Sequence, residues 1–600
     1  MTIVALLGLT AFSTAAQAIN SRPISVYPVP KTPVASDSTG FSFRGVKPRD
    51  LGPIKVVGTR SGRHGGSRVP HSDGRGVSWV PRNDFVPGEY VRVQTRRNLI
   101  RSGNSRFWVR IGRFYGNDDK PAGPGEPKPR DGLKSRPDLK PVTLDVLESE
   151  IESTAGKIFF APKEDGLSIA DRLGRISYFQ PIGFESKGNQ VWNFQRRTYR
   201  NRQVLTYWKG PSSSQQASPV GRFSQIGHYV ILDNNYRRIA RFTPGNGYES
   251  NIHEFEITPR DTALVAAYRG VRRDLRPVGG KKNGKILDNV VQEVDLKTGA
   301  VLFEWHGIGS VAIKASEAPV PKDGSLWDFL HINAAKTDAD SYLLSGRRMS
   351  TIYRVDRRTA RVKWRLRGDG KKPKTNNFEL GDGADFGYQH DMKRLANGDI
   401  SLFDNSINRP ESPLPEIHDQ SSAVILNLSG TEKGREATLV QRYNHEPDPV
   451  VSCSQGSAQQ LEDGNVFVGW GSVSRMTEFT PEGDIAFDAT FDDAEESSYR
   501  ASRAPWRGLP GGRPAIASKA TGSGATVWAS WNGATLIRHW KVLTGSDPGE
   551  LEEVGESNWK GLETEIPVDT VKTKVQVVAY GDEDEELGRS KLISLGRQSR

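Results

Sequence analysis

The sequence predicts an all-β protein, and three observations carry this prediction. Short runs of alternating apolar and polar residues, bounded by Gly, Pro, Asn and Asp, recur along the 600-residue chain, as strands and turns do. The composition, 35% apolar and 26% charged, is that of a globular protein, and the length favours several domains. One strand–turn–strand pattern also returns with spacings of 62, 62, 61, 71 and 53 residues between its anchors, Asp171, Asp233, Asp295, Asp356, Asn427 and Thr480. Such a period indicates repeated supersecondary units.

The repeated unit is best defined after His253. Four consecutive strands are predicted there: His253–Glu256, Ala263–Arg269, Asn289–Asp295 and Ala300–Trp305. Four antiparallel strands per unit, repeated six times, favour a six-bladed β-propeller. An open array of sheets is the alternative, but it would leave many strand edges unprotected. The predicted fold class is therefore all-β: a six-bladed β-propeller with small N-terminal and C-terminal β-sandwich-like domains.

Composition and pattern also predict the domain boundaries. They are a signal peptide at 1–18, a small β domain at 41–115, a linker rich in Pro, Gly and Lys at 116–141, the propeller at 142–510 and a β-sandwich at 515–597. Residues 19–40 are predicted to form a tail between the signal and the first domain.

The predicted signal consists of an apolar run, Ile3–Phe12, followed by Ala16-Gln17-Ala18. This pattern predicts cleavage after Ala18 and a secreted or extracytoplasmic protein. A membrane anchor is the competing interpretation, but the run is too short to cross a bilayer, so no stable membrane span is expected. The single cysteine, Cys453, excludes a disulfide within the chain.

The net charge of +12 is concentrated near the N-terminus. Residues 41–140 contain 22 Lys or Arg and 9 Asp or Glu, whereas residues 512–600 contain 11 and 13. Such a region could bind a polyanion, but its bases are scattered and match no nucleic-acid motif. A solvated basic surface is favoured, and no nucleic-acid partner is expected.

Three predicted hairpins carry a histidine in the same position. They begin HEFEITPRDTALVAAYR at His253, HINAAKTDADSYLLSGRR at His331 and HDMKRLANGDISLFDNS at His390. A fourth copy, GSAQQLEDGNVFVGWGS, has Gly456 or Ser457 there, so the hairpin does not need histidine to fold. Because the first strand of a propeller blade is normally innermost, the three imidazoles are expected to converge at one mouth of the central channel.

The hairpin that contains His331 also brings an arginine to the site. Its first strand is predicted to open at His331, its turn to cover Lys336–Asp340 and its second strand to run from Ser341 to near Arg347. Antiparallel pairing then places His331 and Arg347 at the same edge. Adjacent strand residues point to opposite faces, so only one of Arg347 and Arg348 can face the channel.

Three imidazoles and a guanidinium around one hollow suit an anion that carries a transferable group. Arg347 offers a planar fork for sulfate, phosphate or carboxylate. A histidine with a pKa near ~6.5 is largely neutral at pH 7 and can attack an electrophilic sulfur or phosphorus or carry a proton. The other histidines could donate to oxygens on which charge develops.

Several motifs resemble those of one known family. DFLHIN and SGR around His331 and Arg347, QHD at Gln389–Asp391 followed by NGDISLFDN, and GSAQQLEDGNVFVGWG at Gly456–Gly471 are similar to the arylsulfate sulfotransferase family. The resemblance extends over Lys134–Phe491 and less specifically into the flanking domains. It implies a six-bladed propeller with an accessory β domain, an aryl sulfate donor in place of a nucleotide sulfate, a phenolic acceptor and no cofactor.

The resemblance also implies the roles of the site residues. His390 matches the nucleophile that forms a sulfohistidine in a ping-pong cycle. His331 and Arg347 match the pair that holds the sulfuryl oxygens, and His253 matches a histidine that stabilises oxygen or transfers a proton. Asn333 matches a substrate-binding asparagine. The chain departs from the family pattern in its basic N-terminal region and in the lone cysteine, which cannot form the family's internal disulfide.

Other interpretations stay open. The three histidines could hold a divalent metal and hydrolyse an ester or lactone, although Arg347 would repel the metal and no carboxylate is in phase with them; we expect no metal. With water as acceptor the site would be a sulfatase, and a non-catalytic secreted propeller would be a binding platform. Asn427-Leu428-Ser429 weakly matches a glycosylation acceptor. Oligomeric state is not predicted, and the remaining histidines are expected to be structural or exposed.

Overall fold

The computed structural model describes residues 22–114, 130–149, 156–162, 165–182, 189–211, 227–369, 377–407, 416–432, 434–491, 497–522, 524–569 and 571–596. Within these ranges the regular elements are β-strands and four 3-10 helices: η1 (Pro48–Asp50), η2 (Arg276–Val278), η3 (Ile313–Ala315) and η4 (Arg347–Met349). The all-β prediction is confirmed. The predicted signal peptide lies outside the described residues, and so does much of the predicted linker. No helix in the described part of the chain is long and apolar enough to cross a membrane.

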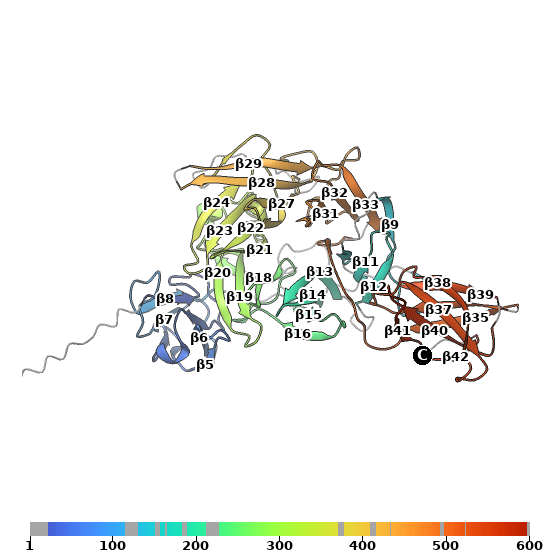
Figure 1. Cartoon of the computed structure of the whole chain (residues 1–600). Coiled ribbons are helices and arrows are strands. Elements are labelled where there is room, and N and C mark those ends of the chain that lie inside the picture. The colour runs from blue at the N-terminus through green and yellow to red at the C-terminus, as the bar shows by residue number, and fades with distance from the viewer. Residues whose placement is uncertain are drawn as a thin grey trace, which may run out of the picture.

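Consecutive antiparallel sheets form the central region and lie around a common centre (Figure 1). The first contains β10 (Lys157–Phe160), β11 (Gly166–Ala170) and β12 (Ile176–Pro181). The second contains β13 (Asn189–Tyr199), β14 (Arg202–Pro211), β15 (His228–Leu232) and β16 (Arg238–Phe242). The third contains β17 (Phe255–Ile257), β18 (Thr262–Arg273), β19 (Gly284–Asp295) and β20 (Val301–His306).

The series continues in the same way. The fourth sheet contains β21 (Ile332–Asp338), β22 (Ser341–Gly346), β23 (Thr351–Asp356) and β24 (Val362–Arg367). The fifth contains β26 (His390–Arg394), β27 (Ile400–Asp404), β28 (Ser422–Thr431) and β29 (Gly434–Tyr443), with β25 (Glu379–Leu380) parallel to β29. The sixth contains β30 (Ser457–Gln460), β31 (Val466–Gly469), β32 (Arg475–Phe479) and β33 (Ile485–Phe491).

Two short strands connect the last sheet with the first. β34 (Ser502–Ala504), which follows the last sheet in sequence, pairs with β10, and β9 (Leu144–Ser149), which precedes the first sheet, pairs with β33. These pairings tie the two ends of the central region together through backbone hydrogen bonds. Neither strand was predicted from the repeat.

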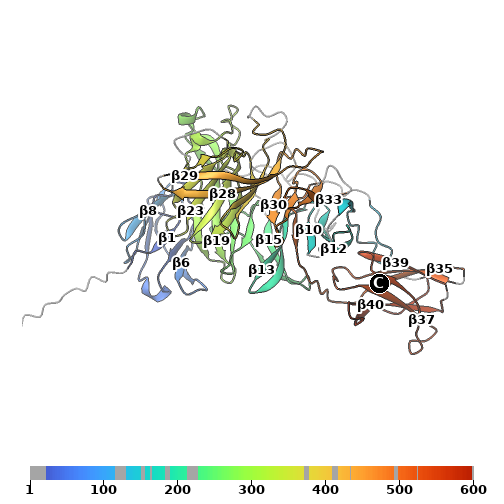
Figure 2. The same cartoon turned by 45° about the horizontal axis from the view of Figure 1, so that its top comes forward.

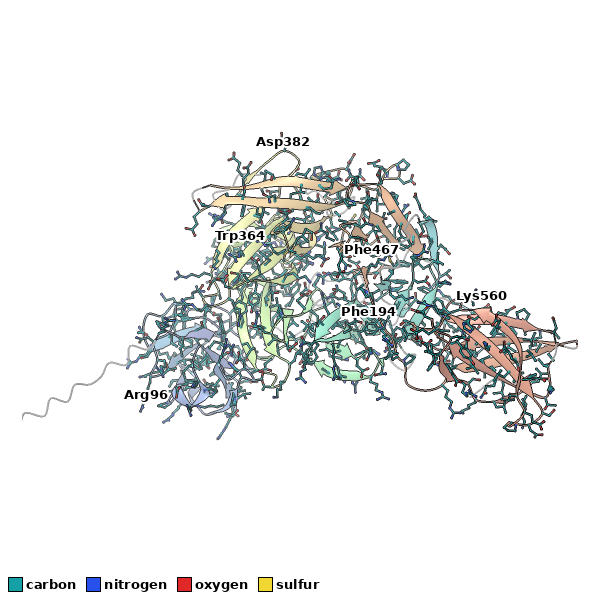
Figure 3. The ribbon with its side chains drawn as sticks, viewed as in Figure 1. Arg96, Phe194, Trp364, Asp382, Phe467 and Lys560 are labelled. Atoms are coloured by element: carbon teal, nitrogen blue, oxygen red, sulfur yellow. The ribbon has the colours of Figure 1, made fainter. Side chains whose placement is uncertain are left out.

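The faces of the sheets pack on one another because both faces of many strands are apolar, as buried strands require. Each neighbouring pair of sheets shares a cluster of buried side chains, and the last pair, the sixth sheet with the first, shares Phe487 and Phe467 with Ile158 and Phe160. Figure 3 labels Phe467 and Phe194 within the central region, and both rings are fully buried. The hydrophobic core is therefore a series of intersheet clusters around the centre.

The N-terminal region consists of two sheets around one core. One contains β1 (Ser25–Tyr27), β2 (Phe41–Arg44), β6 (Gly76–Pro81) and β5 (Gly66–Pro70); the other contains β4 (Gly62–His64), β3 (Lys55–Gly58), β7 (Tyr90–Gln94) and β8 (Arg106–Arg110). Strand β1 and buried Ile24 belong to this unit, which differs from the tail predicted for residues 19–40. The unit is fastened to the third sheet by hydrogen bonds from the amides of Gly40 and Ser72 to Asn246 (3.0 Å) and Asp295 (2.8 Å).

The C-terminal region also has two sheets around a core, on the opposite side of the central region in both views (Figures 1 and 2). One contains β35 (Ala515–Thr521), β36 (Gly524–Ser530) and β39 (Glu563–Val568). The other contains β38 (Glu552–Asn558), β37 (His539–Gly545), β40 (Lys574–Tyr580) and β41 (Glu586–Arg589), with β42 (Ile593–Ser594) on β40. Asn532 fastens this region to β12 by exchanging hydrogen bonds with the backbone of Phe179.

The hairpin around His331 differs in detail from its prediction. The predicted turn, Lys336–Asp340, is shorter in the structure, because β21 continues to Asp338 and pairs with β22 down to Asp338 and Ser341. Ala339 and Asp340 alone make the turn, and Ala339 has the left-handed φ of 52° that tight hairpin turns require. Lys336 is therefore a buried strand residue rather than an exposed turn residue.

Candidate active site

The three predicted histidines lie at the inner ends of neighbouring sheets. His253 precedes β17, His331 precedes β21 and His390 is the first residue of β26. All three side chains are buried, with exposed fractions of 4%, 7% and 2%. The structure brings the first two into direct contact, since their Nε2 atoms are 3.1 Å apart. The ring of Tyr499 links the third, lying 5.7 Å from the His253 ring and 6.3 Å from the His390 ring between centroids.

The partner behind His331 is Asp328, three residues earlier in DFLH. Its Oδ2 is 2.5 Å from Nδ1 of His331. Burial opposes ionisation of Asp328, but His331 and the two arginines of η4, Arg347 and Arg348, hold the pKa of this carboxyl below its ordinary value. An ionised carboxylate only accepts hydrogen bonds, so Nδ1 of His331 carries a proton.

The partner behind His253 is Asn251. Its Oδ1 accepts a hydrogen bond from the backbone N–H of His253 at 2.9 Å and lies 2.7 Å from the Nδ1 atom of the ring. The backbone donor identifies the side-chain oxygen of Asn251, because the amide nitrogen could not accept it. Nδ1 of His253 is therefore a donor too.

The contact between the two Nε2 atoms then requires one further proton. With both Nδ1 atoms protonated, two neutral rings would face each other with lone pairs, whereas a proton between them makes a hydrogen bond. Burial lowers the pKa of both imidazoles, more strongly for His253 than for His331, which Asp328 partly compensates. The shared proton is thus weakly held, as a proton donor in a reaction requires.

His390 has a different environment. Its Nδ1 is 2.6 Å from Oδ1 of Asn405, and Nδ2 of Asn405 donates to the carbonyls of Ser452 and Gln455 at 2.7 and 3.1 Å. The two donations fix the orientation of the amide, so Nδ1 of His390 donates and Nε2 keeps its lone pair. The backbone N–H of Gln455 points at that lone pair from 3.2 Å. Burial, and next the charge of Arg347, lower the pKa of His390 well below its ordinary value.

Arg347 supplies the fixed positive charge of the site. Its backbone N–H donates to the carbonyl of His331 at 3.0 Å, as the predicted pairing of the two strand ends requires. Its Nη2 donates to the carbonyl of Cys453 at 2.7 Å, and the guanidinium lies 5.6 Å from the centre of the Tyr388 ring. Its charge lowers the pKa of all three histidines.

Arg348 does not follow the alternation that was expected. The second strand ends at Gly346, and Arg347 and Arg348 belong to η4. Strand alternation therefore does not decide between them, and both charges lower the pKa of Asp328 and His331. Arg347 is nevertheless the more buried of the two, and it is the one whose charge acts on His390.

Asn333 lies beneath the site and is fully buried. Its Nδ2 donates to the carbonyl of Gln389, the residue before His390, at 2.8 Å. Its Oδ1 is buried, and no hydrogen bond to it is present among the described residues. An amide oxygen repels an anionic oxygen and accepts from a hydroxyl, so this atom suits a phenol O–H rather than a sulfate oxygen.

A buried group of charges below the histidines was not predicted. Arg500 lies between Glu254 and Asp391, with nitrogen–oxygen distances of 3.0 and 3.1 Å, and Lys336 is 3.1 Å from Glu254. Glu254 directly follows His253, and Asp391 directly follows His390. An acidic residue after the histidine was therefore a sequence signal from which the buried charges could have been predicted. Arg500 follows the last repeated hairpin, where no periodic pattern marks it.

Left-handed backbone accompanies the site. Four residues without the freedom of glycine have φ of 56°, 55°, 46° and 66°: His331, Tyr388, Asp391 and Gln455. Such conformations cost roughly 1–3 kcal/mol each and persist where surrounding contacts impose them. Each belongs to the site or adjoins one of its histidines, so the surrounding sheets hold this backbone in place.

Several other predicted features can now be located. Asn427 is exposed on β28, and its Nδ2 donates to Asp399 at 2.8 Å; its glycosylation stays a prediction. Cys453 is half-buried and forms no disulfide. Within the described residues, no group of three or more His, Cys, Asp or Glu side chains is arranged to hold a metal ion.

The geometry defines a buried histidine site with a fixed guanidinium, of the kind that transfers an anionic group. The family model for arylsulfotransferase (ASST) matches residues 197–492, which include all the predicted site residues. This match supports the arylsulfotransferase family for the chain, and with it arylsulfotransferase activity in general and small-molecule substrates.

Other comparisons add little. No curated protein matches the chain. Similar solved structures include a protein of unknown function from Bacteroides caccae (12% identity, 58% of this chain and 99% of that chain, TM-score 0.35). An auxiliary nutrient binding protein from Bacteroides ovatus (10%, 78% and 98%, 0.29) and virginiamycin B lyase from Staphylococcus aureus (9%, 63% and 99%, 0.23) are also similar. These TM-scores are too low to support an argument.

Proposed function

We propose that the protein moves a sulfuryl group from an aryl sulfate to a phenol through a sulfohistidine at His390. The observation that carries the proposal is the state of this imidazole. Asn405 fixes its proton on Nδ1 and burial favours the neutral ring, so Nε2 keeps a lone pair, which accepts from the backbone N–H of Gln455, and Arg347 is close enough for its charge to act on the ring. A neutral imidazole beside a fixed cation suits attack on an anionic sulfate ester.

In the first half-reaction, Nε2 of His390 releases the Gln455 N–H and attacks sulfur. The N–S bond forms as the bond from sulfur to the aryl oxygen breaks. The leaving phenolate takes the proton shared by His253 and His331 and departs as a phenol. Arg347 stabilises the sulfuryl oxygens, and the Oδ1 of Asn405 stabilises the Nδ1–H of the positively charged ring.

In the second half-reaction, a phenol acceptor returns its proton to the His253–His331 pair and attacks sulfur with its oxygen. The N–S bond breaks, and its electron pair restores the Nε2 lone pair of His390. The Oδ1 of Asn333 would accept from the acceptor's hydroxyl before transfer. No cofactor is needed, because protons and electrons balance over the two steps.

The proposal includes the architecture around the site. We infer a closed six-bladed propeller flanked by two small β-sandwich domains. Its closure is supported by the pairing of β34 with β10 and of β9 with β33, and by the core that the sixth sheet shares with the first. A secreted location, with cleavage near Ala18, is part of the same proposal and rests on the sequence pattern.

Two alternative activities lead to different measurements. Transfer to water would make the protein a sulfatase, and the test is repeated release of the phenol, well beyond one equivalent per chain, without a phenol acceptor. A three-histidine metal hydrolase would need His253 and His331 to turn their Nε2 atoms from each other toward an ion. Activity on other esters that appears with added divalent metal would favour it, and a binding platform would show neither activity.

The test is the intact mass of the purified chain after mixing with a chromogenic aryl sulfate, with chelator present. We expect a mass gain of one sulfuryl group that added phenol removes, and no gain in His390→Ala. A fully active His390→Ala variant would refute the proposal. Circular dichroism and thermal melting of the variant check that its fold is retained.

A further inference from the structure

One face of the N-terminal region gathers basic side chains in a regular pattern. In the sheet formed by β4, β3, β7 and β8, alternate residues point inward into the core, among them Val56, Val91, Val93, Phe107 and Val109. The alternate positions between them point outward and include Lys55, Arg63, Arg92, Arg106 and Arg110. We call this outward surface the basic sheet face.

The register places these bases close together on one face, each separated from the next by a diagonal step or by one intervening residue. Val57 lies between Arg63 and Arg92, while Gln94 lies between Lys55 and Arg106. Neighbouring strands are about 4.8 Å apart, and residues two apart along a strand are about 6.8 Å apart. The positive charges therefore recur at backbone intervals of about 8–10 Å, which is a pattern for a repeating polyanion rather than for one small anion.

No acidic residue offsets these charges on the four strands, whose sequences are KVVG, GRH, YVRVQ and RFWVR. Within the described part of the chain, no ion pair involves Lys55, Arg63, Arg92 or Arg106. Like charges this close together on one face of a sheet repel one another. Folding alone gives no reason for this arrangement, whereas binding of an anion does.

Two exposed aromatic residues lie among the bases. Tyr90 and Trp108 are 44% and 38% exposed, and their rings meet edge to face with centroids 5.2 Å apart. The guanidinium of Arg110 covers Tyr90 from 5.7 Å. These rings already contact one another and a cation, so they are not free flat surfaces on which the nucleobases of a single-stranded nucleic acid could stack. The face therefore binds through its charge.

We propose that the basic sheet face is a docking surface for an anionic polysaccharide, a linear polymer with regularly spaced sulfate or carboxylate groups. Charge complementarity is the basis, since a row of guanidinium and ammonium groups matches such groups along a chain. Strands β7 and β8 lie on the outer part of the N-terminal region in the view of Figure 1. The proposal is independent of sulfuryl transfer.

The experiment measures binding of heparin, as a probe, to the full chain by calorimetry at several salt concentrations. We expect binding that weakens steeply with salt. The triple variant Lys55→Gln, Arg92→Gln, Arg106→Gln should bind at least tenfold more weakly and lose about three from the slope of log Kd against log salt, because about three counterions fewer are released.

The matched control removes the same charge from exposed bases of the C-terminal region, in Arg513→Gln, Lys519→Gln, Lys560→Gln; Figure 3 labels Lys560 at the upper edge of that region. Its affinity should stay within twofold of the parent. Equal losses in both triple variants would show that only net charge acts and would overturn the proposal. Arg92→Lys, Arg106→Lys keeps the charges and should retain most of the binding, which separates charge from damage to the sheet.

Two further probes decide the class of partner. A single-stranded oligonucleotide of matched charge and vesicles containing anionic lipid should bind more weakly than heparin at the same salt. If the oligonucleotide or the vesicles bind as tightly as heparin or tighter, and the triple variant of the basic sheet face loses this binding, the polysaccharide proposal is overturned. The partner is then a nucleic acid or a membrane. Phenolate release from an aryl sulfate should be unchanged in the variant, so a failure here is distinct from a failure of the proposed function.

Discussion

His331 and His390 occupy the same position in neighbouring repeats, yet the groups behind their rings differ in charge. The carboxylate of Asp328 accepts from Nδ1 of His331, whereas the uncharged amide of Asn405 accepts from Nδ1 of His390. The carboxylate partly offsets the burial that lowers the pKa of His331, whereas burial and Arg347 lower the pKa of His390 well below its ordinary value. In the proposed function, one structural position thus supplies a proton donor or a nucleophile according to the residue that accepts from Nδ1.

The largest expected effect is on activity when His390 or His331 is replaced by alanine, and it distinguishes the roles of the two histidines. His390→Ala removes the nucleophile, so turnover of an aryl sulfate should fall at least about 1000-fold and the covalent adduct should vanish. His331→Ala removes half of the proton-sharing pair, so turnover should fall about 100-fold or more while the adduct still forms. Phenolate release and intact mass measure the two effects. An adduct in His390→Ala but not in His331→Ala would reverse the assigned roles.

Replacing the carboxylate alone should have the next largest effect. Asp328→Asn gives His331 an amide partner like that of His390. The loss of negative charge lowers the pKa of His331 further, so the donating form is lost at a lower pH as pH rises. We expect turnover at pH 7 to fall about 100-fold for phenyl sulfate, which has a poor leaving group, and the alkaline limb of the pH profile to move down.

The leaving group distinguishes proton donation from structural support. Nitrophenolate needs little protonation, so nitrophenyl sulfate should lose much less activity in Asp328→Asn than phenyl sulfate does. An equal loss for both substrates would mean that Asp328 only holds the backbone of His331. Asp323→Asn, a change at an exposed aspartate of the same loop, is the matched control and should leave both rates unchanged.

A smaller effect is expected when the amide behind the nucleophile is removed. Asn405→Ala leaves Nδ1 of His390 without its acceptor, so the ring can hold its proton on either nitrogen. Loss of the hydrogen bond to Nδ1, about 1–2 kcal/mol, corresponds to a fall of roughly tenfold in the rate of adduct formation. The variant also loses the donations to the carbonyls of Ser452 and Gln455, so the fall should be at least this large. Asn251→Ala removes the equivalent acceptor from His253, so it should slow adduct formation from phenyl sulfate much more than from nitrophenyl sulfate, whereas Asn405→Ala should slow it for both donors. Rapid-quench mass measurements compare the two.

The sequence predicted the repeated strands and the three histidines because both follow a period. The hairpin pairing that brings Arg347 to His331 follows from antiparallel geometry, and it is present as a 3.0 Å backbone hydrogen bond. Alternation failed at Arg347 and Arg348, because the strand ends one residue earlier and a 3-10 turn follows. A strand ending is set by local contacts that a period does not contain.

The supporting residues could not be found in this way. Arg500 reaches Glu254 from 246 positions away, and the three-residue strand β34 pairs with β10 at a similarly long range. Both lie outside the repeats, and neither has neighbours in sequence that mark it. Asn405 lies within NGDISLFDN, but its function depends on the segment 452–455 folding back on it. Closure of the central region creates these contacts.

The smallest expected effect concerns the stability of the fold. It extends the comparison of His331 and His390 to His306, a histidine that has two carboxylates beside it. Buried His306 lies 2.6 Å from Asp288 and 3.0 Å from Glu304. Burial opposes its charge, but the two carboxylates more than offset this and raise its pKa to about 10. Because the folded value lies above the unfolded value of ~6.5, the stabilisation is complete below pH 6.5 and is lost as pH rises toward 10.

We therefore expect the free energy of unfolding to fall by about 1–4 kcal/mol between pH 7 and pH 10 through this group. His306→Asn should be less stable at pH 7 and should lack this part of the pH dependence, as urea unfolding at the two pH values would measure. His228, whose pKa burial lowers to about 4, is neutral throughout this range, so His228→Asn should keep the parent's slope. If the unfolding free energy of His306→Asn falls between pH 7 and pH 10 as much as that of the parent, His306 is not charged between its carboxylates. The inference that a neighbouring carboxylate raises the pKa of His331 would then lack support from the equivalent contact at His306.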